Sequence, residues 1–245
     1  MKLSLGIGIS IIGVSLFYQS LSHAAVVMTG TRVIFPANKI EKTIQLQNKD
    51  DNPNIVQVWL DRGNPASTPD TADAPFIANP QIFKISPNEG QMVRLIFTGN
   101  KFEFPADQES IFYLNFSEIP GVKAGKVDQS QLMIVFKNRL KVFFRPEKLP
   151  YPATEIADHI HYQFGGTPSQ PKVTIENNSV YFASISEANI INNGTETPLQ
   201  KNTMIAPKTS VVWDVPIQNF DRTKATINLG LINDYGVTVK KELLK

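Results

Sequence analysis

The sequence predicts an all-β protein of two antiparallel β-sandwich domains in tandem, on three observations. Short runs rich in Val, Ile, Thr and aromatic residues recur along the chain, separated by clusters of Pro, Gly, Asn and Asp. This pattern is typical of strands joined by turns. No long stretch repeats apolar residues at the helical period. The 245 residues are enough for two domains of about 100–120 residues each.

The first 24 residues have the three parts of a cleavable export signal. Lys2 supplies the positive charge, Leu5–Phe17 is an apolar stretch, and Ser22-His23-Ala24 supplies the small residues that precede a cut. The alternative is a membrane anchor, but that needs about 20 apolar residues and this run is shorter. We therefore expect residues 1–24 to be removed after Ala24 and the mature protein to be soluble outside the cytoplasm.

Strand-like runs follow closely on one another in the first predicted domain, residues 25–146. The polar stretch Asn48–Asn54 predicts a turn, and the Pro- and Asp-rich stretch Asn64–Pro80 predicts an irregular loop. Trp59 ends an alternating run, and we expect it to pack between two sheets. The predicted strands before the last one are Val26–Phe35, Ile44–Gln47, Ile55–Leu60, Ile82–Ile85, Met92–Thr98 and Glu109–Glu118.

The last predicted strand of this domain, Gln131–Pro146, is much longer than the usual strand of about 5–6 residues. Its first half is apolar on both faces, and its second half carries four basic residues. A long strand that is apolar at one end tends to pair with another chain unless the fold protects it. We therefore expect pairing with another chain to be its function.

A domain boundary is predicted after Pro146, where a Pro-containing stretch without apolar period begins the second domain, residues 147–245. The segment Asp158–Phe164 is ambiguous, and Asn192–Thr197 predicts a polar turn. The predicted strands of this smaller sandwich are Lys172–Asn177, Val180–Ile190, Met204–Pro207, Val211–Val215, Ala225–Ile232 and Val237–Glu242.

Composition excludes several functions. A net charge of only +2 gives no general basic surface for nucleic acid, and the absence of cysteine excludes thiol catalysis and cysteine-ligated metals. His159 and His161 could ligate a metal beside Asp158, but two surface histidines are the favoured reading. No hydrolase elbow or phosphate-binding loop occurs. We expect no enzyme, no metal, no cofactor and no further membrane-inserted segment.

Four segments together resemble the PapD-like periplasmic chaperones of the chaperone–usher pathway of pilus assembly. They are Thr31–Pro36 (TRVIFP), Phe104–Pro120 (FPADQESIFYLNFSEIP), Lys141–Pro146 (KVFFRP) and Ile232–Gly236 (INDYG). One departure is Phe116, where the family usually has an aliphatic residue. The resemblance implies two immunoglobulin-like sandwiches in an L or boomerang arrangement.

The resemblance also implies a function. Such a chaperone binds and stabilises pilin or fimbrial subunits by donor-strand complementation in the periplasm. It then delivers them to an outer-membrane usher. The short loop Ile119–Ser130, with no flanking cysteines, is similar to the short-loop branch of the family. A secreted or surface protein with a structural or adhesive role is the alternative, and the sequence leaves open a self-capping homodimer of the free protein.

The resemblance assigns Leu132, Ile134 and Phe136 as the residues donated to a subunit. They alternate along the strand and therefore share one face. Alternation alone leaves open that they face the domain's own core, because the other face of this half-strand is apolar as well.

The resemblance assigns Arg32 and Lys141 as the anchor for the subunit's C-terminal carboxylate. Two cations suit a carboxylate chemically, although two exposed surface cations are the alternative. Lys141 is nine residues from Leu132, so strict alternation places it on the opposite face. We expect a bulge near Lys137-Asn138-Arg139 to reconcile the two roles.

The resemblance assigns Glu109, Arg145 and Asp234 to a salt-bridge network between the two domains. Their role is then structural, because they would hold the angle of the cleft. The alternative is three unrelated surface charges, whose pairing would contribute about 0–1 kcal/mol each.

Overall fold

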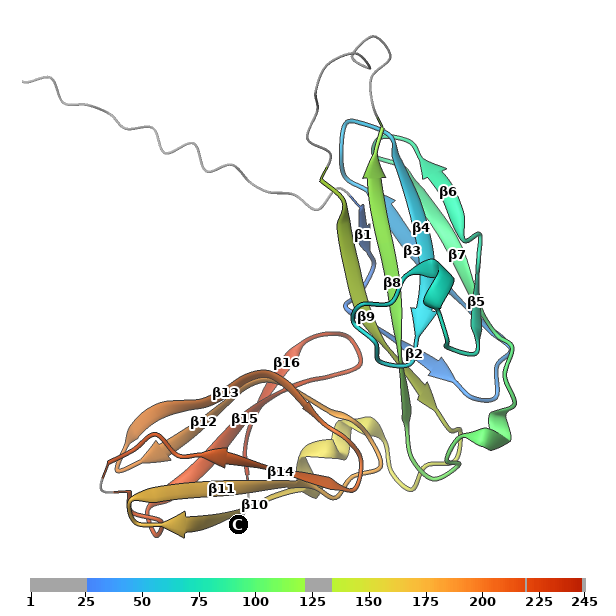
Figure 1. The fold of residues 1–245 in the computed structure, drawn as a ribbon. Helices are drawn as coiled ribbons and strands as arrows, with labels where there is room; N and C mark the ends of the chain where they lie inside the picture. The colour runs from blue at the N-terminus through green and yellow to red at the C-terminus, as the bar shows by residue number, and fades with distance from the viewer. Residues whose placement is uncertain (1–25, 122–133, 219, 244–245) are drawn as a thin grey trace, which may run out of the picture.

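The computed structural model describes residues 26–121, 134–218 and 220–243, which form two β-sandwiches set at an angle to each other (Figure 1). The predicted fold class is confirmed: two all-β sandwiches follow one another along the chain. In the described part of the chain, helix is confined to three short 3-10 segments, η1 (Pro69–Thr71), η2 (Lys101–Glu103) and η3 (Ala153–His159). No described helix is long and apolar enough to cross a membrane.

The first sandwich packs a four-stranded sheet against a five-stranded sheet. The smaller sheet has the order β1 (Val26–Met28), β3 (Glu41–Asn48), β7 (Gly90–Phe97), β5 (Phe76–Asn79). The larger sheet has the order β2 (Arg32–Pro36), β9 (Phe136–Arg145), β8 (Ser110–Pro120), β4 (Asn54–Asp61), β6 (Ile82–Ile85). Alternate residues of the larger sheet form its half of the core, among them Val58, Leu60, Leu114, Val142 and Phe144.

The second sandwich packs a three-stranded sheet against a four-stranded one. The first has the order β10 (Ile160–Thr167), β11 (Gln170–Asn177), β14 (Thr209–Asp214). The second has the order β13 (Thr195–Ile205), β12 (Ala183–Asn192), β15 (Ala225–Ile232), β16 (Thr238–Glu242). A predicted domain boundary after Pro146 would fall between β9 and η3, and it stays a prediction.

Two predicted boundaries in the first domain were wrong in detail. The predicted strand Val26–Phe35 is divided, because the chain leaves the four-stranded sheet after β1 and joins the other sheet as β2. Gly30, with φ +93°, lies at this crossing, where a left-handed backbone favours glycine. The predicted loop Asn64–Pro80 contains β5, whose four residues were too few to stand out in a Pro- and Asp-rich stretch.

Trp59 does not pack between the sheets. It is buried, but it lies outside the main core cluster, on the outer face of the five-stranded sheet. Its indole Nε1 donates to Ser67 Oγ at 3.0 Å, so the loop after β4 covers the ring. The alternation of β4 explains this, because Val58 and Leu60 use the inner face and leave Trp59 outward.

The predicted strand Gln131–Pro146 is a strand from Phe136 to Arg145, and residues 131–133 lie outside the described part. Its pairing with β8 runs from Phe136↔Glu118 to Phe144↔Ser110 without a register shift. The expected bulge near residues 137–139 is therefore absent. Pairing with β2 is shorter, from Arg32↔Lys141 to Pro36↔Arg145. Among the described residues, the second edge of β9 is thus unpaired from Phe136 to Leu140.

Candidate functional site

Alternation along β9 gives its two faces different surroundings. Val142 and Phe144 point into the first domain's core, so Lys141, Phe143 and Arg145 point outward. On this outer face, the Phe143 ring lies 5.9 Å from that of Phe182, a residue of the second domain. The end of β9 therefore forms one wall of a cleft between the domains.

Arg32 and Lys141 meet in this cleft as register partners on the parallel strands β2 and β9. Each is oriented by the second domain. Arg32 Nη1 donates to the Ile232 carbonyl oxygen at 2.9 Å, and Lys141 Nζ lies 3.4 Å from Ser184 Oγ. Both side chains are partly buried, and among the described residues neither forms an ion pair.

Electrostatics makes this pair of cations receptive to an anion. Burial lowers the pKa of Lys141, and the positive charge of Arg32 lowers it further. Burial also lowers the pKa of Arg32, against the opposing pull of Asp234 and Glu109. A carboxylate placed between the two cations would offset their repulsion and could accept hydrogen bonds from both.

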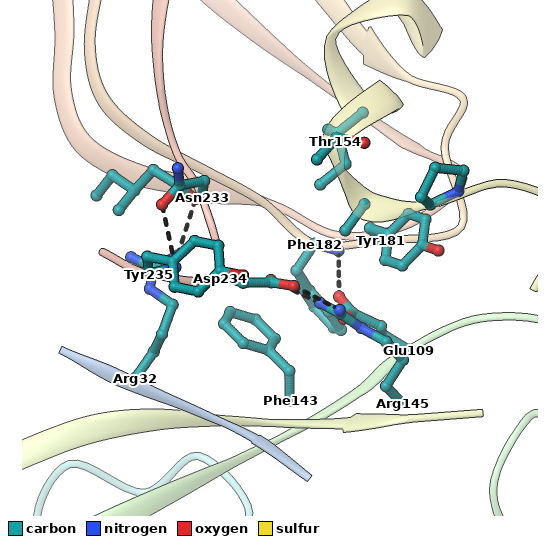
Figure 2. A pocket seen from close by; sticks show the side chains of 14 residues that line it. Arg32, Glu109, Phe143, Arg145, Thr154, Tyr181, Phe182, Asn233, Asp234 and Tyr235 are labelled. Carbon is teal, nitrogen blue, oxygen red and sulfur yellow. Dashed lines mark hydrogen bonds and ion pairs between the residues drawn. The ribbon is translucent and has the colours of Figure 1, made fainter. Parts of the chain in front are cut away.

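Glu109, Arg145 and Asp234 come together at the other side of the same cleft (Figure 2). Arg145 Nε donates to Glu109 Oε1 at 2.7 Å, and its two terminal nitrogens bind both oxygens of Asp234 at 2.6 and 2.8 Å. Glu109 also accepts from the backbone N–H of Phe182 at 2.9 Å. The three residues thus join β9 and the residue before β8 to the β15–β16 turn and to the residue before β12 in the second domain.

The network affects the charged forms of Arg145 and Glu109 differently, as their pKa values show. Burial would lower the pKa of Arg145, but the hydrogen bonds and charges of Asp234 and Glu109 raise it above its ordinary value. Burial raises the pKa of Glu109, only partly opposed by Arg145. The asymmetry arises because Arg145 has two acidic partners, whereas Glu109 has one cation and the like charge of Asp234 nearby.

The β15–β16 turn, which carries Asp234, fits closely against the first domain. Gly236 has φ +84°, and a Cβ at this position would lie 2.4 Å from Thr31 Oγ1. Any other residue would therefore both strain the backbone and displace the Thr31 side chain of the first domain. Neighbouring Tyr235 is 88% exposed and, with Arg32, lines a cavity of about 300 Å³ between the domains (Figure 2).

At the opposite end of β9 the strand is apolar and accessible. Ile134 is 56% exposed and Phe136 47% exposed, so neither is enclosed in the domain's own core. Leu132, the third predicted donor residue, lies outside the described residues. Because β9 has no bulge, Phe136 shares a face with Leu140 and Val142, and Lys141 lies on the other face. The predicted donor residue Phe136 and the predicted anchor Lys141 therefore use opposite faces of one unbroken strand.

Sequence reasoning missed two groups of this site. Ser184 and the Ile232 carbonyl contact the two cations from the second domain. A lone serine and a backbone carbonyl carry no sequence signal, although Ile232 begins the INDYG segment. His159 and His161, considered as metal ligands beside Asp158, do not share one element: His159 ends η3, where its ring stacks on that of Tyr151 with centroids 3.9 Å apart, and His161 lies on β10. Among the described residues, no three potential metal ligands cluster.

Two β-sandwiches with a pair of cations in the cleft between them and an exposed apolar strand have the features of a protein that binds another polypeptide chain. Comparison with family models identifies the family of binding proteins to which the chain belongs. Residues 25–150 match the pili and flagellar-assembly chaperone PapD N-terminal domain, and residues 155–243 match the pili assembly chaperone PapD C-terminal domain. The chain therefore belongs to the PapD-like family of pilus-assembly chaperones, and the resemblance of the four segments is confirmed.

Individual relatives agree with this membership. The probable fimbrial chaperone YadV of Escherichia coli is 32% identical over 91% of each chain. The chaperone protein MrkB of Klebsiella pneumoniae is 31% identical over 91% of this chain and 92% of its own. The crystal structure of YadV superposes with a TM-score of 0.75, 29% identity, and coverage of 89% of this chain and 98% of that one. These relatives are named as chaperones, and the family is not enzymatic.

Proposed function

We propose that this protein is a periplasmic chaperone that binds and stabilises pilin or fimbrial subunits by donor-strand complementation. One observation carries the proposal. One edge of β9 from Phe136 to Leu140 has no partner strand among the described residues. It has an exposed apolar end, and the cation pair Arg32 and Lys141 follows immediately at its other end. An open strand edge binds extended backbone, and a charged anchor fixes where that backbone ends.

The same geometry sets the direction of the bound strand. β2 runs parallel to β9 and begins at Arg32, so a partner strand beside residues 136–140 would occupy the position that β2 leaves empty. If the partner's terminal carboxylate reaches Arg32 and Lys141, its chain must approach in the direction of β9. The subunit's last strand would therefore pair parallel with β9.

Leu132, Ile134 and Phe136 are proposed to fill the groove of an incomplete subunit sandwich. Each large apolar side chain contributes about 1.5–3 kcal/mol when fully buried. The face that carries Phe136 also carries the chaperone's own core residues Leu140 and Val142. One face of a single strand would thus complete two cores, its own and that of the subunit.

Further parts of the proposal concern location and hand-over. An export signal, residues 1–24 with cleavage after Ala24, would bring the protein to the periplasm, and the complex would then pass to an outer-membrane usher. A self-capping homodimer would be one way to cover the exposed Ile134 and Phe136 before a subunit arrives, because an open apolar edge favours self-association.

Co-expression with a pilin subunit encoded next to the chaperone gene tests the proposal. The wild-type chaperone should be recovered from the periplasmic fraction together with the folded subunit, and the double variant Arg32→Ala, Lys141→Ala should recover none. Normal recovery with the double variant would overturn the anchor. A wild-type protein found on the cell surface, with no subunit bound, would favour the structural or adhesive alternative.

A further inference from the structure

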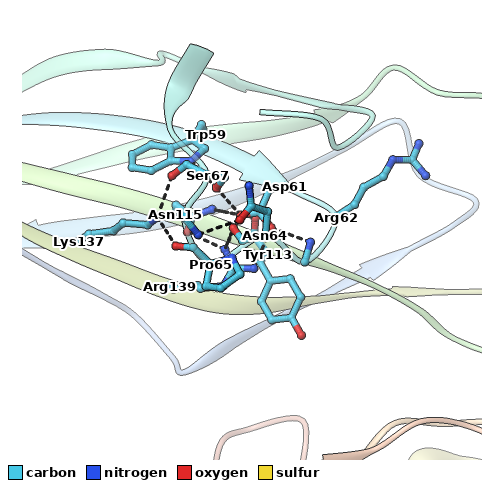
Figure 3. Close-up of polar contacts among 12 residues, drawn as sticks. Trp59, Asp61, Arg62, Asn64, Pro65, Ser67, Tyr113, Asn115, Lys137 and Arg139 are labelled. Carbon is cyan, nitrogen blue, oxygen red and sulfur yellow. Dashed lines mark hydrogen bonds and ion pairs between the residues drawn. The ribbon is translucent and has the colours of Figure 1, made fainter. Parts of the chain in front are cut away.

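A second polar cluster lies on the outer face of the five-stranded sheet, under the loop that follows β4 (Figure 3). Its centre is the carboxylate of Asp61, which is fully buried. This carboxylate accepts hydrogen bonds from Ser67 Oγ at 2.7 Å, Asn115 Nδ2 at 2.6 Å and Arg139 Nη2 at 2.8 Å. None of these residues lines the cavity between the domains, so the cleft itself does not explain the cluster.

Arg139 connects three strands through this cluster. Its guanidinium extends from β9 across β8 and contacts both oxygens of Asp61 at the end of β4. On the way Nη1 donates to Asn115 Oδ1 at 3.1 Å, and it also reaches the Asn64 carbonyl oxygen at 3.2 Å. The ring of Tyr113 lies 4.0 Å from the guanidinium and covers it.

Lys137 attaches the same strand to the loop. Its Nζ donates to the carbonyl oxygens of Pro65 and Ser67, both at 2.8 Å, and it lies 5.3 Å from the ring of Trp59. Both outward cations between Phe136 and Lys141 are thus bound to the chaperone's own first domain. They are not presented to a ligand as free charges.

Lys137 and Arg139 make these contacts in the part of β9 that has only one paired edge among the described residues. From Phe136 to Leu140 the strand is paired on one side only within the described part of the chain, so its register there depends on a single backbone ladder. Backbone groups repeat every two residues, and a ladder alone therefore tolerates slippage. The contact of Arg139 with a buried carboxylate fits one register, because a slip would leave that carboxylate without its cation.

We propose that Arg139 and Lys137 are positioning residues for subunit binding, which hold residues 136–140 in unbroken register with β8, so that no bulge forms between Phe136 and Lys141 and their separation stays fixed. A subunit held at both its carboxylate and its groove requires that separation to be constant. The two residues act through the strand and do not touch the subunit. This inference rests on the proposed function of the same strand.

Hydrogen exchange and subunit capture together test this role. The variants are Lys137→Met and Arg139→Lys, the latter keeping the charge but losing the two-pronged contact with Asp61. In the free chaperone we expect amides of residues 136–140 to exchange at least about tenfold faster, with other strands of the first domain unchanged. Capture of the pilin subunit encoded beside the chaperone gene should fall at least about fivefold at equal amounts of folded chaperone.

A stability-matched control separates positioning from general stability. Val93→Ala removes core volume from the opposite sheet, away from β9, and should lower the melting temperature without changing exchange at residues 136–140 or capture. Unchanged exchange in both test variants would overturn the inference, as would equal loss of capture in Val93→Ala. A wild-type chaperone that captures no subunit would instead overturn the proposed function, and the positioning role with it.

Discussion

Arg32 and Lys141 lie opposite each other on two parallel strands, at the residue where β9 loses its second neighbour. Among the described residues, the second pairing of β9 therefore begins at the same place as two cations that form no ion pair. A partner strand that continues the line of β2 would reach these charges with its last residue.

The titration of Lys141 should be visible in carboxylate binding. Its pKa is lowered by burial and by Arg32, and only the protonated amine attracts an anion. Affinity should therefore be complete at neutral pH and decline as pH rises through a pKa below that of an ordinary lysine. Lys141→Arg should remove the decline, because arginine stays protonated. Calorimetric titration with a peptide of the subunit's last residues, from about pH 7 to about pH 10, measures this.

The same peptide with an amidated C-terminus is the control for the carboxylate. It should bind weakly at every pH and show no dependence on Lys141. If the amidated and free peptides bind equally well, the cation pair does not recognise a terminal carboxylate.

Ile134→Asp should weaken subunit capture without harming the chaperone. The side chain is 56% exposed in the free protein, so its change should move the melting temperature by only about 1–2 °C. Loss of about 1.5–3 kcal/mol of burial in the complex corresponds to at least about a tenfold loss of affinity. Pull-down of co-expressed subunit and thermal melts of the free chaperone measure the two effects.

A core variant gives the reverse pattern and serves as comparison. Leu114→Ala on β8 removes a fully buried side chain and should cost about 2–5 kcal/mol of unfolding free energy. Should Ile134→Asp destabilise the free chaperone as much as Leu114→Ala does, Ile134 would belong to the chaperone's own core.

Arg145→Ala should destabilise the protein far more than loss of an ordinary surface ion pair. It leaves the carboxylate of Glu109, only 2% exposed, without its cation, at a cost of about 3–5 kcal/mol. Addition of Glu109→Gln should recover part of the loss, because the unpaired charge is then gone. Urea unfolding of the single and the double variant measures the two changes in unfolding free energy. Arg94→Ala, whose pair with Glu41 is about half exposed, should cost only about 0–1 kcal/mol, and an equal effect would contradict the prediction.

The sequence predicted what depends on pattern and resemblance, and it failed where three-dimensional neighbours decide. Alternation located most strands, but it missed β5 and most of β13, and it left β10 undecided. The Arg32, Lys141, Arg145 and Asp234 segments were found by their motifs. Alternation also gave the correct opposite faces for Phe136 and Lys141, and the bulge was invoked wrongly against it. Trp59 was misplaced because a buried aromatic under a loop and one in a core share the same local pattern.

The first domain should lose stability in acid through Asp61. Burial would raise the pKa of this carboxyl, but hydrogen bonds from Arg139, Ser67 and Asn115 outweigh burial and lower its pKa below the ordinary value. A folded-state pKa below the unfolded one means that the stabilisation is complete above about pH 5 and is lost as pH falls below about 4. Asp61→Asn should therefore differ most from wild type at neutral pH, and the difference in unfolding free energy should shrink in acid.

Urea unfolding midpoints between about pH 2.5 and pH 7 measure this difference. Asp214→Asn is the matched control, because Asp214 also pairs with a cation, Lys172 at 3.5 Å, but its side chain is 88% exposed. Its difference from wild type should stay near zero throughout. A gap between wild type and Asp61→Asn that is constant with pH would mean that the carboxylate's charge adds nothing. The packing of the loop over Trp59 would then depend on hydrogen bonds that asparagine can also accept.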